Sequence, residues 1–274
     1  MIYDINGNIL NGCYDSEGTE IEQAYDVDGN ALIPVSNNIT VMTYNVQWFT
    51  GLNADESMQR EILSTYNPDI IGLQELGAGM PSLGTTLFSD YAETELGIQH
   101  NKTGCVSKYT FSSVDADVFP DQTGETRGYQ KAYFTFNGKT ICWINTHLAT
   151  SSYESEKVAQ AGVLFDLVQN EEYFIITGDF NTVCKSVNDA EYTTIMKQFI
   201  DAGYNSANCS NQHGFIDTWT GGKTASDTWY PCDQIITSSN ITIDNVVADT
   251  LKIETSGGQQ VIDHIPLIAY LTVS

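Results

Sequence analysis

The chain has 274 residues, of which 41% are hydrophobic and 17% are charged, and this is enough to bury one large core. Its 35 acidic residues against 11 basic ones give a formal net charge of −24 at pH 7, which excludes the broad cationic surface of a tight nucleic-acid binder. A gain in solubility explains this charge without any functional role, and phosphate chemistry, if present, would depend on bound cations.

The N-terminal stretch differs in composition from the rest of the chain. YDINGNIL (3–10) and YDVDGNAL (25–32) are near copies, each with Asn-Gly or Asp-Gly at the corner of a predicted hairpin. We predict a β-hairpin repeat arm over 1–38, for attachment or oligomerisation, with a disordered or cleaved leader as the alternative, and a separate domain over 39–274. We expect no membrane span, because no apolar run reaches about 18 residues. MIYDINGNIL lacks the basic and apolar regions of a secretory signal.

From residue 39 onward, predicted strands are interspersed with predicted helices. The predicted strands are ITVMTYNV (39–46), DIIGLQE (69–75), GCVSKYTF (104–111), KAYFTF (131–136), KTICWINTHL (139–148), YFIITGDF (173–180), DQIITSS (233–239) and HIPLIAYLTV (264–273). Helical spacing of apolar residues predicts helices over 57–66, over 158–169 with an apolar face of Val158, Ala161, Phe165 and Val168, and over 189–202. Because strands dominate, this pattern favours a layered α/β sandwich over a barrel with strict strand–helix alternation.

Six of these apolar runs carry polar side chains at one end. Four runs finish on them, at Asn45, at Glu75, at His147, and at Asp179 with Asn181; two later runs begin on them, at Asp233 and at Asp263 with His264. A polar residue at the end of one strand does not indicate a functional site, because every strand must end. Six such ends, all bearing metal ligands, acid/base groups or hydrogen-bond donors, predict one shared sheet edge where these side chains converge.

The chemistry that suits these groups is hydrolysis of a phosphate ester. Asn45, Glu75 and Asp263 offer the hard oxygen ligands that Mg²⁺ prefers. Histidines without a neighbouring serine or cysteine nucleophile favour acid/base work on a water molecule over covalent catalysis. An aspartate beside each imidazole would fix its tautomer and hold it protonated when needed.

The same residues lie in motifs that resemble the endonuclease/exonuclease/phosphatase superfamily, the deoxyribonuclease I-like proteins. The motifs TYNVQWF, IIGLQE, INTHL, GDFNT, CDQIITS and IDHIPL occur in the family's order and cover about residues 39–273. The resemblance implies a four-layer α/β sandwich, with two mixed β-sheets face to face and helices outside. It also implies a divalent cation, Mg²⁺ or Mn²⁺, and in-line attack of water on phosphorus.

The resemblance further implies a role for each matching residue. Asn45 and Glu75 would hold the cation with Asp263 nearby, Asp179 and Asn181 would orient the water and the phosphate, Asp233 would pair with His264, and His147 would hydrogen-bond to the phosphate or protonate it. Family proposals differ on whether His264 or Asp179 takes the proton of the water, and both stay open here.

Three positions depart from the family pattern or carry it weakly. Arg127 stands where many members have an arginine, and it is either a phosphate clamp or a surface ion-pair partner. Gln47 replaces a frequent arginine, which removes one phosphate contact. Lys102, with an asparagine before it, stands where a tyrosine or glutamate usually supports the first histidine, so the partner of His147 is not identified.

The six cysteines form no CxxC pair, which disfavours a structural zinc site. Deoxyribonuclease I has a structural disulfide between closely similar positions, so the resemblance implies a Cys184–Cys232 bridge, with two reduced thiols as the alternative. A bridge would favour an extracytoplasmic or virion-associated location, although no secretory signal is visible.

Three functions follow, in this order. The first is a Mg²⁺- or Mn²⁺-dependent phosphodiesterase, with DNA endonuclease as the leading subtype. The second is a phosphatase or phosphodiesterase acting on a small-molecule or lipid headgroup substrate, which the net charge and Gln47 favour. The third is an inactive binding or virion-attachment module. Three features would distinguish these functions. A nuclease should have several Lys or Arg side chains near Asp179, and a small-molecule enzyme should have a closed pocket roofed by residues 76–90. An inactive module should bind no cation at Glu75.

Overall fold

The computed structural model describes residues 37–47, 56–77, 86–97, 102–221, 229–249 and 263–274. By its internal contacts the chain divides into a unit Met1–Asn37 and a unit Asn38–Ser274. The predicted hairpins at 3–10 and 25–32 lie outside the described residues. Every element below belongs to the second unit, and none of its described helices is long and apolar enough to cross a membrane.

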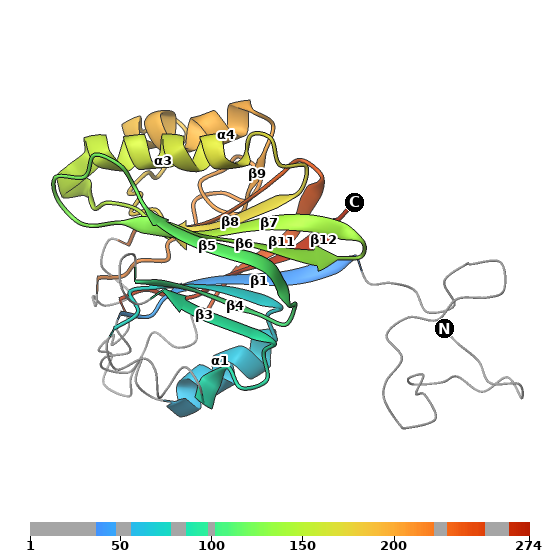
Figure 1. Ribbon diagram of the computed structural model, residues 1–274. Helices are drawn as coiled ribbons and strands as arrows, with labels where there is room; N and C mark the ends of the chain where they lie inside the picture. Colours follow the sequence, from blue (N-terminus) through green and yellow to red (C-terminus); the bar gives the residue numbers. More distant parts are fainter. Residues whose placement is uncertain (1–36, 48–55, 78–85, 98–101, 222–228, 250–262) are drawn as a thin grey trace, which may run out of the picture. The chain divides into compact units, whose positions relative to one another are not determined.

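Two mixed six-stranded sheets stack face to face, with helices on their outer faces (Figure 1). The first sheet has the order β11 (Ile241–Ala248), β12 (Leu267–Val273), β1 (Asn38–Asn45), β2 (Ile70–Gln74), β4 (Thr103–Ser107) and β3 (Glu93–Gly97). The second has the order β5 (Phe111–Val118), β6 (Gly128–Phe136), β7 (Lys139–His147), β8 (Phe174–Asp179), β10 (Asp233–Thr237) and β9 (Asn205–Ser206). Helix α1 (Glu56–Tyr66) covers the first sheet, and α3 (Glu154–Val168) and α4 (Lys197–Asp201) cover the second. The four-layer α/β sandwich is confirmed.

Each sheet contains one parallel pair of strands, and these pairs decide where the polar strand ends meet. In the first sheet β1 and β2 are parallel, with Asn45 opposite Gln74. In the second, β7 and β8 are parallel, with His147 opposite Asp179. The neighbours β12 and β10 run antiparallel to β1 and β8, so their amino ends lie at the same edges as these carboxyl ends. Strands that finish on polar residues and strands that begin on them therefore reach the same edge.

The core consists of apolar layers on both faces of each sheet. Trp143 and Ile175 are buried between the two sheets, whereas Ile144 and Ile176, one position further along, are buried under the outer helices. Strands β7 and β8 are covered on both faces, and this explains why their sequences are almost continuously apolar. A third cluster lies between α1 and the outer face of the first sheet.

A buried hydrogen-bond network joins the two sheets beneath the polar edge. The indole of Trp143 donates to Thr177 Oγ1 (2.9 Å), and Thr177 donates to Asn145 Oδ1 (3.1 Å), all within the second sheet. The amide of Asn145 donates across to the carbonyl of Leu73 (2.8 Å), and Gln74 Nε2 donates back to Asn145 Oδ1 (2.7 Å). Because buried polar groups tolerate few alternative partners, this network fixes one sheet against the other.

Three of the predicted elements differ in the structure. The predicted strand 104–111 is two strands, β4 and the start of β5, separated by a bend. The predicted helix 189–202 contains a π-helical segment, Tyr192–Met196, before α4. The buried face of α3 includes Lys157 and Gln160 beside Ala161, Leu164 and Val168, while the expected Val158 and Phe165 are only partly buried.

Candidate active site

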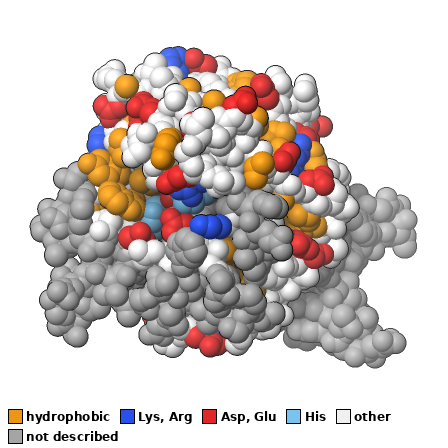
Figure 2. Space-filling view, turned by 60° about the vertical axis from the view of Figure 1, so that its left-hand side comes forward, with side chains coloured by type: hydrophobic (Ala, Val, Ile, Leu, Met, Phe, Trp, Pro, Cys, Tyr) orange, Lys and Arg blue, Asp and Glu red, His pale blue; other side chains and the backbone are white. Residues whose placement is uncertain are grey.

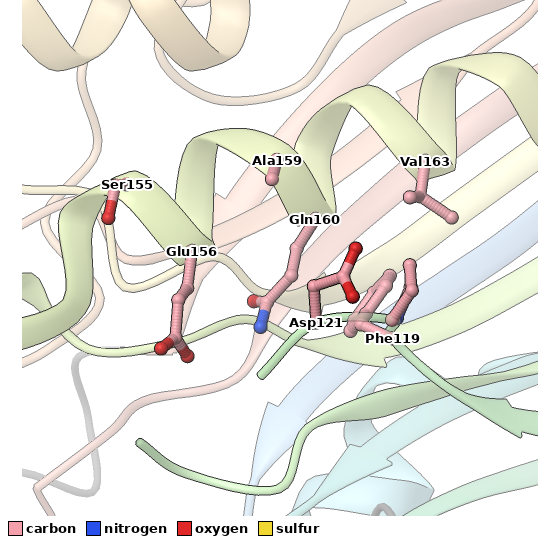
Figure 3. A pocket seen from close by; sticks show the side chains of 8 residues that line it. Phe119, Asp121, Ser155, Glu156, Ala159, Gln160 and Val163 are labelled. Atoms are coloured by element: carbon pink, nitrogen blue, oxygen red, sulfur yellow. The ribbon is translucent and has the colours of Figure 1, made fainter. Parts of the chain in front are cut away.

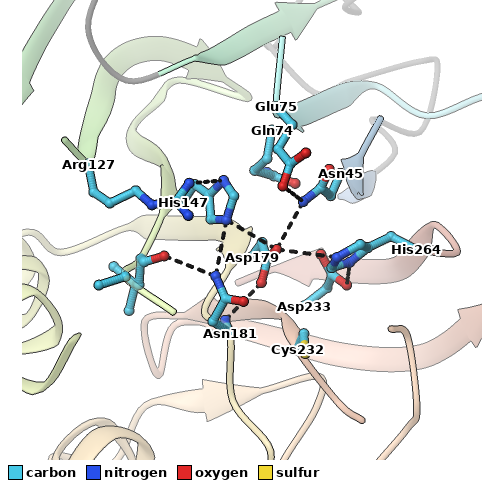
Figure 4. A network of polar contacts seen from close by, with 12 residues as sticks. Asn45, Gln74, Glu75, Arg127, His147, Asp179, Asn181, Cys232, Asp233 and His264 are labelled. Atoms are coloured by element: carbon cyan, nitrogen blue, oxygen red, sulfur yellow. Dashed lines mark hydrogen bonds and ion pairs between the residues drawn. The ribbon is translucent and has the colours of Figure 1, made fainter. Parts of the chain in front are cut away.

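The predicted site residues come together at the shared edge of the sheets (Figure 4). Asn45 ends β1, Glu75 follows β2, His147 ends β7, Asp179 ends β8 with Asn181 just beyond, Asp233 begins β10, and Asp263 and His264 precede β12. Figure 2 shows histidine side chains on this face beside carboxylates and beside Lys or Arg side chains. The site is thus built from both sheets.

Asp179 lies at the centre of the cluster and is only 1% exposed. Asn45 Nδ2 donates to its Oδ2 (3.0 Å), and the backbone N–H of Asn181 donates to its Oδ1 (2.8 Å). The Nε2 atoms of His147 and His264 lie 3.3 and 3.5 Å from the same Oδ2. Burial raises the pKa of Asp179, and the neighbouring Asp233 raises it further against the opposing charge of His264.

His264 forms a charged pair with Asp233. Its Nδ1 lies 2.9 Å from Asp233 Oδ2. Burial alone would lower the pKa of His264, but the carboxylates of Asp233 and Asp179 outweigh burial and raise this pKa to about 10. At neutral pH both ring nitrogens of His264 therefore carry protons, and Nδ1 donates to Asp233. Asp179, Asp233 and His264 also offer ligand atoms that all lie within 4.8 Å of one another.

His147 has the opposite protonation state, because its partner is Arg127. Arg127 Nη1 lies 2.8 Å from His147 Nδ1, and since a guanidinium only donates, Nδ1 accepts and the ring proton is on Nε2. Burial lowers the pKa of His147 well below its usual range, and the positive charges of Arg127 and His264 lower it further. The Nε2 atom of His147, 3.3 Å from Asp179 Oδ2, thus belongs to a neutral imidazole.

Arg127 thereby supplies the partner of His147 that the sequence did not identify. It is also held by Glu125, whose Oε2 accepts from Arg127 Nε (3.0 Å). Sequence reasoning missed Glu125, for which the only signal was its place two residues before the arginine. The role of Arg127 as a phosphate clamp stays a prediction.

Replacing Arg127 with methionine is expected to raise the pKa of His147. The change removes a positive charge and the donor to Nδ1, while the burial of the ring remains. The measurement is a ¹⁵N NMR titration of the histidine side chains in EDTA, which also reports the tautomer. Lys131→Met, a partly exposed cation bound to Glu171 on the same sheet, is the matched control. An unchanged His147 pKa would show that burial alone sets its protonation.

Asn181 occupies a backbone conformation that few residues adopt. Its φ is 50°, in the left-handed region that asparagine tolerates better than most side chains. Its Nδ2 donates to the carbonyl of Leu148 (3.0 Å) and lies 3.1 Å from His147 Nε2. The turn after β8 therefore aims the amide of Asn181 at the end of β7.

The oxygen atoms around Glu75 and Asp263 fit a divalent cation. Glu75 Oε1 accepts from Asn45 Nδ2 (3.1 Å). The Oδ1 atoms of Asp233 and Asp263 are buried and find no hydrogen-bond partner within the described chain. The pKa of Asp263 is raised to about 6, chiefly by burial. The positive charge of His264 lowers this pKa, whereas the negative charges of Glu75, Asp179 and Asp233 raise it. Such a surplus of hard, negative oxygens is what Mg²⁺ or Mn²⁺ neutralises.

The expected Cys184–Cys232 bridge is wrong, because both cysteines are free. Cys184 Sγ lies 3.2 Å from Cys209 Sγ instead, while the thiol of Cys232 donates to the carbonyl of Thr182 (3.2 Å). The loop after β9 places Cys209 where the resemblance implied Cys232. An extracytoplasmic or virion-associated location consequently loses the observation that favoured it and stays a prediction.

A cavity of about 220 Å³ lies beside α3 and belongs to the scaffold of the site (Figure 3). Its lining includes Phe119, Glu156 and Gln160. Glu156 Oε1 accepts from the backbone N–H groups of Thr123 (2.9 Å) and Gly124 (3.1 Å). These contacts anchor to α3 the loop that leads to Arg127.

Comparison with known proteins agrees with this arrangement. The Endonuclease/Exonuclease/phosphatase family matches residues 42–265. No curated protein matches the chain.

Among solved structures, the chain is similar in fold to a humanized D. rerio TDP2 (20% identity, 86% of this chain, 99% of that chain, TM-score 0.67). It is also similar to D. rerio TDP2 complexed with a single strand DNA product, at 20% identity over 85% of this chain and 98% of that chain, with a TM-score of 0.67. A third similar structure is an endonuclease/exonuclease/phosphatase from Bacteroides vulgatus, at 16% identity over 86% of this chain and 99% of that chain, with a TM-score of 0.69. The family match covers most of the chain and includes both halves of the site. The chain therefore belongs to the endonuclease/exonuclease/phosphatase family of metal-dependent phosphoesterases and nucleases.

Proposed function

We propose that the protein is a divalent-metal-dependent phosphodiesterase that cleaves DNA by in-line attack of water. The observation that carries this proposal is the surroundings of Asp179. This buried carboxylate receives N–H groups from both sheets and lies between a neutral imidazole, His147, and a protonated one, His264. A proton acceptor beside two imidazoles of different charge suits the activation of water and the stabilisation of phosphate charge.

Each residue then has a part in the reaction. Asp179 orients the water and accepts its proton, because protonated His264 has no acceptor atom. His264 stabilises the charge on a phosphate oxygen, and Asp233 keeps it protonated. Asn181 and His147 donate to the phosphate group. Asn45, Glu75 and Asp263 would hold Mg²⁺ or Mn²⁺, which when bound neutralises charge on the phosphate.

DNA is the first substrate because a protein of the same fold, D. rerio TDP2, has been solved with a single strand DNA product. The second candidate is a small-molecule or lipid headgroup phosphate. The net charge of −24 favours it, since long-range repulsion weakens the binding of a long polyanion more than that of a short one. Both candidates use the same hydrolytic residues.

The test is nicking of supercoiled plasmid in Mg²⁺ or Mn²⁺. We expect nicking by the wild-type protein, and its loss in EDTA and in His264→Ala, because both remove positive charge from the phosphate. Asp244→Ala, a change at an exposed carboxylate on β11, is the matched control and should cut normally.

Intact plasmid with the wild-type protein would contradict the DNA endonuclease. The same preparations would then be assayed with bis-p-nitrophenyl phosphate and with inositol phosphates. Hydrolysis of these compounds that requires both metal and His264 would identify an enzyme for small-molecule or lipid headgroup phosphates. Inactivity on every substrate would favour an inactive binding module.

A further inference from the structure

We propose that the buried ion pair Lys157–Glu191 is a positioning device for Asn181. The inference rests on the proposed hydrolytic function of the site. Lys157 lies on α3, and its side chain is 0% exposed. Its Nζ lies 2.7 Å from Glu191 Oε1 and donates to the carbonyl of Asn181 (2.9 Å).

Stability alone does not explain this pair. Removing two charges from water costs several kcal/mol per ion, and replacing a buried pair with apolar residues of similar volume is often neutral or stabilising. The rest of the buried face of α3, with Ala161, Leu164 and Val168, already attaches the helix to the second sheet. The reason for two buried charges therefore lies in the groups that they bind.

Both charges bind backbone of the segment 181–183. The ammonium of Lys157 holds the carbonyl of Asn181, and the second carboxylate oxygen of Glu191 accepts from the backbone N–H of Val183 (2.6 Å). Between them, Thr182 Oγ1 donates to the carbonyl of Pro231 (2.6 Å). An apolar pair of the same volume would satisfy none of the backbone groups that the two charges hold.

This restraint acts on a residue with a disfavoured backbone. A φ of 50° at Asn181 persists only where the surroundings impose it. The amide of Asn181 faces Leu148 and His147, while its carbonyl faces Lys157 on the opposite side. Lys157 thus holds the segment from the side opposite His147.

The neighbouring position on α3 holds the other parallel strand. Gln160, one turn after Lys157, accepts through Oε1 from the backbone N–H of Ala149 (2.8 Å). The segments leaving β7 and β8 are therefore both tied to one face of one helix. We infer that the polar part of this face sets the spacing between His147 and Asn181.

The test is the paired apolar replacement Lys157→Met/Glu191→Leu. Because it removes both buried charges together but also leaves the Asn181 carbonyl and the Val183 N–H without their partners, we expect these effects to offset and the Tm to stay near that of the wild type. We expect kcat on bis-p-nitrophenyl phosphate to fall about 10-fold or more with a smaller change in KM, since a misplaced group lowers turnover. Lys197→Met/Asp201→Leu, which removes an exposed pair on α4, is the matched control and should change neither value.

Two further readouts separate positioning from stability. Amide exchange at Val183 should become faster in Lys157→Met/Glu191→Leu although the Tm is retained, because its acceptor is gone. In an Asn181→Ala background the paired replacement should cost no further turnover, since the effect passes through Asn181.

Retained kcat together with retained protection at Val183 would overturn the proposal and leave the pair a purely structural contact. An effect on kcat that adds fully to that of Asn181→Ala would also overturn it. If the wild-type protein hydrolyses no phosphodiester, the proposed function fails, and exchange at Val183 then decides whether the pair fixes the segment.

Discussion

Replacing Asp179 with asparagine is expected to lower kcat about 10³-fold, within the range that a lost general base produces. Asparagine keeps the size of the side chain, so the fold should persist. It cannot accept a proton, and its NH₂ group would face the donors of Asn45, His147 and His264. Steady-state kinetics with bis-p-nitrophenyl phosphate and Tm measurements on the same preparations test this. Asp244→Asn, at an exposed carboxylate on β11, should be indistinguishable from the wild type.

The pH profile distinguishes the two possible bases. If Asp179 accepts the proton and His264 acts as an imidazolium, kcat should hold through neutral pH and fall as the pH approaches the pKa of His264, about 10. If His264 were the base, kcat would rise over that range as the ring lost its proton. A rising alkaline limb, or full activity in Asp179→Asn, would contradict the assignment to Asp179.

The second large effect is expected from Gly72→Ala, which should destabilise the fold by about 3 kcal/mol or more. A methyl group on Gly72 would lie 2.2 Å from Thr177 Oγ1 and 2.5 Å from Asn145 Oδ1. Both atoms belong to the buried network between the sheets and are held by hydrogen bonds, so neither moves away freely. Urea unfolding followed by tryptophan fluorescence measures the loss.

A matched glycine should respond in the opposite direction. Gly162 lies inside α3 with no atom within 4 Å of the position of an added Cβ. Gly162→Ala is expected to stabilise the protein by about 0.5–1 kcal/mol, because alanine loses less backbone entropy in a helix. Equal urea midpoints for Gly72→Ala and Gly162→Ala would show that the sheets separate easily to admit the methyl group.

The positions of the polar strand ends made most of the site predictable. Asn45 and Glu75 end parallel neighbours in one sheet, and His147 and Asp179 end parallel neighbours in the other. Asp233 stands at the beginning of its apolar run, not at the end. Because this strand, β10, is antiparallel to β8, its beginning lies at the same edge as Asp179. Whether the polar residues begin or end an apolar run therefore indicated the direction of that strand in the sheet. Edge strands such as β5 and β11 were missed because many of their residues are exposed and give no apolar run.

The sequence prediction made no use of polar residues that interrupt apolar runs, although these residues mark buried hydrogen-bond networks. Asn145 and Thr177 interrupt two buried strands, and together they form the network between the sheets. Lys157 begins the buried stripe that continues through Ala161 and Leu164, a position where a solvated lysine would not occur. Cys209 lies in a loop at φ 51°, and no strand or helix pattern extends to it, so its contact with Cys184 depends on tertiary structure.

The strand order makes the site depend on pairing between segments that are far apart in the sequence. The first strand of the sandwich, β1, pairs on one side with β12, among the last residues of the chain, with Asn38 opposite Thr272. The residues just before β12, Asp263 and His264, complete the site. A nascent chain that has produced His147 and Asp179 still lacks the imidazolium and one edge of the strand that carries Asn45. The two halves of the site are therefore joined only when β12 pairs with β1, and partly folded chains that stop at β8 hold an incomplete cluster.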